Sequence, residues 1–361
     1  LWVIFGFSLV LLWDQWQVYN GHKPTFLPSA KTAAPADSSA PPAASASGVP
    51  AAAAPAAGAV PVQGSAPAIG EKVTVSTDVF KATIDGEGGT LSELQLLQFL
   101  DQTNHGGLVE WARRLVGLPV PQNEVHPVLL MENGSPATRY VAQTGLLNTV
   151  DTGDRFPNHL SLMTARPGPR ELAEGQNKLE VVFESQPVGG IKYVKTYVFQ
   201  RGDYTIRVNH QVVNVSDKPR DAQLYLQFTR HGTVAAGTMF GTNTFTGPAI
   251  YTEQKKFQKI DFSAITKGKV ELPAPADNGW VAMVQHYFVS AWLLNVPGSD
   301  TIKREFRVAD LGNNLFSVAM VLKLPALAPG ASQAIDSNLF AGPEEEKKLE
   351  AIATGLDLVK D

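Results

Sequence analysis

The side chains best suited to acid–base or metal chemistry in this sequence are its histidines. They lie at His22, His105, His126, His159, His210, His231 and His286. None of them falls in an HExxH motif or in another spacing that directs ligands to one metal ion. The sequence has no cysteine, which excludes disulfides and thiolate chemistry. We therefore predict no catalytic residue, no metal site and no cofactor.

Two glycine-rich signatures of enzymes are absent from the sequence as well. The sequence has no Gly-x-Ser-x-Gly nucleophile elbow and no phosphate-binding P-loop. The run Ile84–Gly89 reads IDGEGG, but it lacks the third glycine at the required spacing and a following Lys-Ser/Thr. We interpret this run as a tight turn between two strands.

The most specific enzymatic alternative involves His210 and His231. Both histidines lie in strand-like sequence beside a polar residue, and sugar-ring epimerases built on large β-sandwiches use a histidine acid with a carboxylate base. This alternative, a membrane-anchored carbohydrate-binding or epimerase-like protein, requires a carboxylate facing one of these histidines in a concave pocket. The simpler interpretation of His210 is a structural side chain that shares a strand face with Ile206, Val208 and Val212.

The elements that would position such residues are patterned as β-strands. Residues 191–199 and 204–215 are separated by Arg201-Gly202-Asp203 and predict a hairpin. Further strands are predicted at 73–77, 126–131, 139–143, 179–183, 223–228, 280–294, 301–307, 315–324 and 333–339. So many short strands with few helices predict an all-β fold, a large antiparallel β-sandwich, with a barrel as the alternative.

The C-terminal segment breaks the strand pattern. Pro343 suits a first helical position, and acidic residues follow it at the positive end of a helix dipole. Leu349, Ile352, Leu356 and Val359 then recur at helical spacing. We predict a C-terminal helix over 342–361 whose apolar face is a candidate coupling or interaction surface, packed on the sandwich or on a membrane core. A shorter run, Val109–Val116, predicts one or two helical turns.

The N-terminal region predicts a membrane anchor on a tether. Leu1–Trp13 is apolar and uncharged, whereas a helix needs about 20 apolar residues to cross a bilayer. Since residue 1 is not Met, we expect missing residues to complete a transmembrane anchor ending at residue 19, with aromatic residues at the membrane surface. A signal peptide and a buried helix are the alternatives. Residues 20–70, rich in Ala and Pro, predict a disordered linker.

The remaining residues predict one large domain over 71–341 or two small ones. The formal net charge of −4 argues against a nucleic-acid partner, for which a basic surface is expected.

Several segments resemble one known family. Gly279–Trp292 reads GWVAMVQHYFVSAW and closely resembles the block GWxAMxQHYFxSAW in the periplasmic domain of YidC-type bacterial membrane protein insertases. Asp85–Leu91, Lys195–Phe199 and Leu339–Pro343 resemble other parts of that domain, and the N-terminal LLWDQW resembles the family's first transmembrane segment. The resemblance covers essentially the whole chain. Asn104–Asn123 looks longer than the family's hairpin.

The resemblance implies a β-supersandwich, galactose-mutarotase-like in fold, in the periplasm of a protein of the bacterial inner membrane. It implies a non-enzymatic protein that assists insertion and folding of inner-membrane proteins, alone or with the Sec translocon. The implied partners are Sec translocon components, the lipid bilayer through the anchor, and nascent inner-membrane proteins through a membrane core of five helices beyond residue 361. A chaperone-like peptide binder with an exposed apolar groove is a further alternative.

Overall fold

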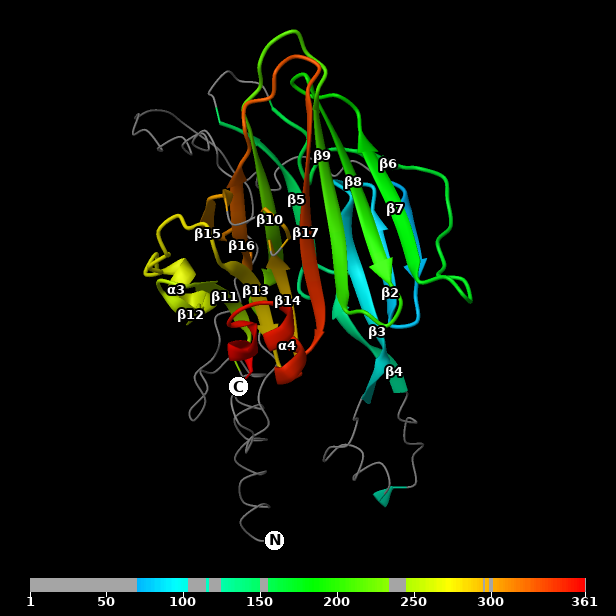
Figure 1. The fold of residues 1–361 in the computed structure, drawn as a ribbon. Coiled ribbons are helices and arrows are strands. Elements are labelled where there is room, and N and C mark those ends of the chain that lie inside the picture. The colour runs from blue at the N-terminus through cyan, green and yellow to red at the C-terminus, as the bar shows by residue number, and fades with distance from the viewer. Residues whose placement is uncertain are drawn as a thin grey trace, which may run out of the picture. The chain divides into compact units, whose positions relative to one another are not determined.

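The computed structural model describes residues 70–102, 115–116, 125–149, 155–233, 245–294, 296–298 and 301–360. The expected anchor and linker, and most of the predicted helical turns at 109–116, lie outside these residues. Within them, the chain forms two large antiparallel sheets that pack face to face (Figure 1). The predicted antiparallel β-sandwich is therefore confirmed. No helix in the described part combines the length and the hydrophobicity that crossing a membrane requires.

The first sheet has eight strands. They are β1 (Lys72–Ser76), β2 (Phe80–Asp85), β3 (Thr90–Gln102), β4 (Val125–Met131), β5 (Tyr140–Asn148), β10 (Ala222–His231), β15 (Arg304–Asp310) and β16 (Leu315–Lys323). Their order is β1-β2-β3-β5-β10-β16-β15, and β4 pairs with β3.

The second sheet has nine strands. They are β6 (Met163–Ala165), β7 (Lys178–Ser185), β8 (Ile191–Gln200), β9 (Thr205–Asn214), β11 (Gly247–Thr252), β12 (Lys256–Lys259), β13 (Trp280–Gln285), β14 (Phe288–Leu293) and β17 (Ser332–Pro343). Their order is β12-β11-β13-β14-β17-β9-β8-β7-β6. A short helix, α3 (Phe262–Thr266), follows β12.

Local sequence explains why these strands form where they do. In β9, apolar and polar residues alternate, and the burial of the side chains alternates with them, so one face of the strand enters the core. The predicted hairpin is the β8–β9 pair. The predicted tight turn joins β2 to β3, where Gly88 and Gly89 adopt φ angles of 68° and 57° that favour glycine.

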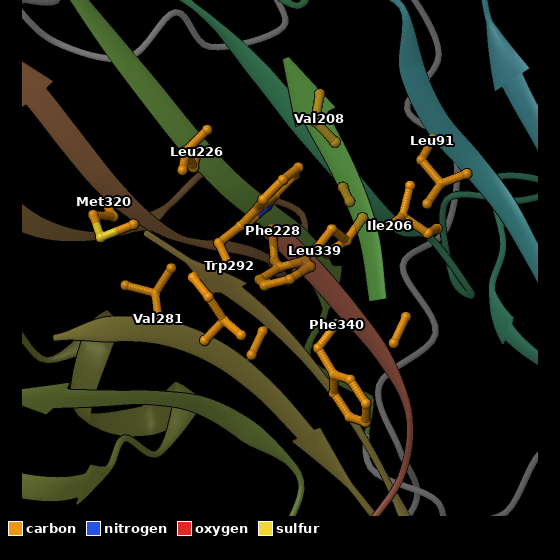
Figure 2. Packing of buried hydrophobic residues seen from close by; sticks show 14 of the residues in the cluster. Leu91, Ile206, Val208, Leu226, Phe228, Val281, Trp292, Met320, Leu339 and Phe340 are labelled. Atoms are coloured by element: carbon orange, nitrogen blue, oxygen red, sulfur yellow. The ribbon is translucent and has the colours of Figure 1, made fainter. Parts of the chain in front are cut away.

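The core lies between the two sheets and is filled by their inward-facing side chains (Figure 2). Leu226 and Phe228 of β10 and Met320 of β16 face Val281 of β13 and Trp292 of β14. Trp292 is fully buried, and its indole N–H donates to the main-chain oxygen of Gln227 over 3.1 Å. This bond crosses from the second sheet to the first, so Trp292 fixes the sheets to each other by a directional contact as well as by packing.

One predicted strand proved to be two. The run 280–294 was expected as a single strand, but it forms the antiparallel hairpin of β13 and β14, which reverses at His286 and Tyr287. Tyr287 has a φ of 67°, and its main-chain oxygen accepts the N–H of Glu344 over 3.0 Å. The turn is therefore stabilised by residues that follow β17, far along the chain.

Candidate interaction site at the C-terminal segment

The C-terminal segment is shorter and more broken than the predicted helix. Pro343 is the last residue of β17 and not the first residue of a helix. Helix α4 spans Glu346–Ile352, and a 3₁₀ turn, η2, spans Leu356–Val359. The continuous helix over 342–361 was therefore wrong in its extent, although a C-terminal helix is present.

Gly355 is where the predicted helix is interrupted. Its φ of 74° lies in the left-handed region, and Ala353 before it is extended at φ −157°. Glycine adopts a left-handed conformation without steric cost, and helices commonly end beside such a residue. The chain therefore changes direction after α4 and makes the separate turn η2.

The predicted apolar face nevertheless comes together on the sandwich. Leu349, Leu356 and Val359 are fully buried in the same hydrophobic cluster as the inter-sheet core, and Ile352 is partly buried against it. Leu358 in the same 3₁₀ turn is 45% exposed, so burial distinguishes neighbouring residues of the segment. Burying a leucine or valine side chain contributes about 1.5–3 kcal/mol.

Two aromatic residues of the second sheet contact the C-terminal segment. Trp280 of β13 donates its indole N–H to the main-chain oxygen of Thr354 over 3.0 Å. Its ring stacks on Tyr251 of β11, with centroids 5.5 Å apart. Gly355 lies so close to Tyr251 that an added Cβ would overlap the tyrosine ring. The segment is thus held by apolar burial, by a hydrogen bond and by close backbone approach.

Ion pairs on the outside of the segment add little to this attachment. Lys360 Nζ lies 2.9 Å from a carboxylate oxygen of Glu346, and Lys348 Nζ lies 2.8 Å from Glu345. These side chains are about half exposed, and exposed pairs of this kind contribute about 0–1 kcal/mol. The buried contacts therefore dominate the docking of the segment.

His210 is a structural residue of the core. It is fully buried; its Nδ1 lies 2.7 Å from the Tyr193 hydroxyl and its Nε2 lies 2.8 Å from Ser337 Oγ. It shares its buried strand face with Val208 and Val212, as the simpler interpretation predicts. The epimerase alternative needs a carboxylate facing this histidine, and hydroxyl groups occupy both ring nitrogens.

His231 also has a hydroxyl group as its neighbour. Its Nδ1 lies 2.7 Å from Thr233 Oγ1 at the exposed end of β10. Across the described ranges, no group of three or more His, Asp or Glu side chains is placed to bind a metal ion.

Sequence reasoning missed a buried lysine. Lys195 on β8 is fully buried and donates to the main-chain oxygens of Gly88 and Thr144, the latter over 3.0 Å. Burial lowers the pKa of Lys195 to about 7. Tyr197, two residues on, donates to Gly89 over 2.6 Å. Together these side chains of the second sheet fix the β2–β3 turn of the first, a role that the alternation of β8 does not reveal.

Comparisons with known proteins agree with the resemblance seen in the sequence. A family model described as the YidC periplasmic domain matches residues 119–361. Curated relatives named "Membrane protein insertase YidC" include those of Burkholderia thailandensis, 47% identical over 365 residues, and Cupriavidus metallidurans, 43% identical over 365 residues. Each alignment covers 100% of this chain and 60% of the relative. The chain thus spans about three fifths of the length of these relatives.

Two solved structures show a distant likeness. A galactose mutarotase related enzyme from Lactobacillus acidophilus gives a TM-score of 0.43 at 7% identity, covering 75% of this chain and 97% of that one. A putative aldose 1-epimerase from Escherichia coli K12 gives a TM-score of 0.42 at 12% identity, covering 76% of this chain and 99% of that one. At this level the likeness carries no information about activity.

Proposed function

The chain belongs to the YidC family of membrane protein insertases, and on this premise we propose that it forms the periplasmic portion of an insertase that assists insertion and folding of inner-membrane proteins. The family that the sequence resembles is confirmed. Relatives that are insertases also support the expectation that the chain is not an enzyme.

The proposed organisation follows the sequence. Residues 1–19 anchor the protein in the inner membrane, 20–70 are a flexible linker, 71–341 form the periplasmic sandwich and 342–361 couple it to a membrane core. The apolar run at the N-terminus and the Ala/Pro-rich stretch after it support the first two assignments. The partners proposed are the bilayer, nascent inner-membrane proteins and components of the Sec translocon, with no nucleic acid.

The observation that supports coupling of the sandwich to a membrane core is the packing of the C-terminal segment against the sandwich. Leu349, Leu356 and Val359 are fully buried, so the segment cannot turn independently of the sandwich without exposing them to water. Trp280 adds a hydrogen bond that fixes the turn at Thr354. A membrane core joined to this segment would be held at a defined orientation to the sandwich, whereas a flexible joint would leave the orientation free.

The experiment compares two leucines of the same 3₁₀ turn in the full-length protein. Leu356→Ala removes a fully buried side chain, and Leu358→Ala removes one that is 45% exposed. We expect Leu356→Ala to weaken docking by about 2–5 kcal/mol and Leu358→Ala to change it by less than about 0.5 kcal/mol. Each variant replaces the native protein in depleted cells, and insertion of an inner-membrane substrate is measured by its protection from external protease.

Limited trypsin digestion provides the structural control. Lys347 and Lys348 are exposed but lie in helix α4, so undocking that unfolds the helix makes their peptide bonds accessible to trypsin. The melting temperature reports separately whether the sandwich is folded. The proposal requires that Leu356→Ala undocks the segment and reduces insertion while the sandwich stays folded. Full insertion activity with an undocked segment would show that coupling through this segment is not the role of the domain.

A further inference from the structure

A hollow lies on the outer face of the first sheet, away from the C-terminal segment. Its volume is about 380 Å³, within the range of about 300–1,000 Å³ that small-molecule pockets occupy. Gln143 of β5 and Gln227 and Thr229 of β10 line it, and they point away from the core because their neighbours Ala142, Leu226 and Phe228 point into it.

The three polar side chains of this floor form a closed hydrogen-bond group. Gln143 Oε1 accepts from Gln227 Nε2 over 3.0 Å and from Thr229 Oγ1 over 2.8 Å, and all three side chains are almost fully buried. Gln227 Oε1 has no hydrogen-bond partner, although it is buried. Exchanging the amide's oxygen and nitrogen would leave its other end unpaired. A buried amide with an unpaired end costs about 1–3 kcal/mol, so a hydroxyl group bound at this end would stabilise the floor.

His159 adds a donor to the same pocket. The Tyr225 hydroxyl accepts the main-chain N–H of His159 over 3.0 Å and lies 2.6 Å from its Nδ1. The hydrogen of this buried hydroxyl needs an acceptor, and its donation to Nδ1 places the ring hydrogen on Nε2. Burial lowers the pKa of His159 to about 3, so the ring is neutral at ordinary pH.

The pocket as a whole is close to neutral. Among the described residues that line it, Arg139 is the only charged one. Glu87 interacts electrostatically with Arg139, and burial raises the pKa of this glutamate. The rim comes from two turns, residues 133–136 and 311–313, which carry further side-chain amide and hydroxyl groups. Because Glu87 offsets part of the Arg139 charge, the hydrogen-bonding side chains of the floor and rim dominate the recognition that the lining offers.

From this geometry we propose that the pocket binds a small neutral polyhydroxyl molecule of monosaccharide size. A hydroxyl group both donates and accepts, so adjacent hydroxyls can satisfy the unpaired amide of Gln227 and the Nε2–H of His159 together. The amides and hydroxyls of the rim offer the same mixture of donors and acceptors. This inference does not depend on the insertase role.

A peptide in strand form does not suit this floor. Strand addition requires a free sheet edge, but β10 is paired with β5 on one side and with β16 on the other. Recognition at the floor must therefore come from side chains on the face of the sheet. That favours a compact ligand over an extended chain.

Saturation-transfer NMR on the full chain tests the proposal, with D-glucose as the probe and N-acetylglycine N-methylamide as the peptide-group probe. Ser135→Trp places a bulky ring on the rim, and Ala137→Trp places the same ring on an exposed residue of the same turn that does not line the pocket. We expect transfer to glucose in the wild type and in Ala137→Trp and its loss in Ser135→Trp.

A variant of the floor gives a second readout. Gln227→Met keeps the length of the side chain and removes its polar atoms, so glucose should bind roughly threefold to tenfold more weakly. Thermal melting checks that each variant is folded. Absence of transfer to glucose, equal transfer in Ser135→Trp, or transfer to the amide probe alone would each overturn the proposal.

Discussion

The indole nitrogen of Trp280 lies 3.0 Å from the main-chain oxygen of Thr354, and this hydrogen bond connects β13 with the bend between α4 and η2. Trp280 is 3% exposed, and its ring also stacks on Tyr251, so one side chain serves both the sheet and the segment packed on it. The attachment of the C-terminal segment and the order of the neighbouring strands are thus coupled.

Trp280→Phe should loosen this attachment without unfolding the sandwich. Phenylalanine keeps an aromatic ring but has no N–H, so the oxygen of the exposed residue Thr354 loses its donor, at a cost of about 0.5–1.5 kcal/mol. We expect faster tryptic cleavage after Lys347 and a lower melting temperature. Phe257, which packs on Trp280, is the matched position, and Phe257→Leu should lower stability while leaving the oxygen of Thr354 bonded. Equal cleavage rates in Trp280→Phe and the wild type would contradict the role of this bond.

Two glycines with the same backbone angle separate conformational strain from close approach. Gly355 and Gly330 both have a φ of 74°, but an added Cβ at Gly330 meets nothing within 4 Å, whereas at Gly355 it overlaps Tyr251. Gly330→Ala should cost about 1–2 kcal/mol, the price of a left-handed alanine. Gly355→Ala should cost more, because the segment must also move away from the ring. Chemical denaturation of both variants measures the difference in the free energy of unfolding. Equal losses would show that the Tyr251 ring moves aside at little cost.

Acid should destabilise the domain through its buried histidines. Burial lowers the pKa of His159 to about 3, whereas the unfolded chain titrates near 6.5. Between these values the unfolded state binds more protons, so the free energy of unfolding falls as the pH decreases from about 6.5 towards 3. His159→Gln should reduce this slope in urea titrations. His126→Gln, at an exposed side chain, is the control, and an unchanged slope in His159→Gln would show that other groups cause the acid sensitivity.

Lys195 should have its effect at alkaline pH. Burial lowers its pKa to about 7 from the usual lysine value of 10.5, so the unfolded state binds more protons between these values and stability rises with pH across this window. Lys195→Met should flatten that rise and lower overall stability, because the oxygens of Gly88 and Thr144 lose their donor. The midpoint of urea unfolding at pH 7 and pH 9 measures the effect. Lys81→Met, at an exposed position of β2, should leave the rise intact.

Alternation and turn residues predicted most strands, and the failures have physical causes. The β13–β14 hairpin was missed because His286 and Tyr287 carry none of the Gly, Asn or Pro signals of a tight turn. The main-chain oxygen of Tyr287 accepts the N–H of Glu344, so the turn is stabilised by a residue far away in the sequence. Pro343 remains in β17 because that strand pairs with β14 up to this residue.

The two sites differ in how much the sequence reveals. Helical spacing predicted the apolar face of Leu349, Ile352, Leu356 and Val359. The same pattern predicted a helix continuing through Gly355, because a single glycine is tolerated within a helical pattern. The pocket at Gln227 was not predicted at all. A glutamine on the outer face of a strand is ordinarily solvent-exposed, and its burial here depends on turns contributed by distant parts of the chain.

The position of β17 has a consequence for biosynthesis. This strand is the last of the described chain, yet it lies inside its sheet, between β14 and β9. Until it emerges, the other strands of this sheet can form only two separate groups, β6–β9 and β11–β14, each with an unpaired edge strand. Completion of the nine-stranded layer must therefore wait until translation has delivered residue 343, and the open edges are exposed to aggregation until then.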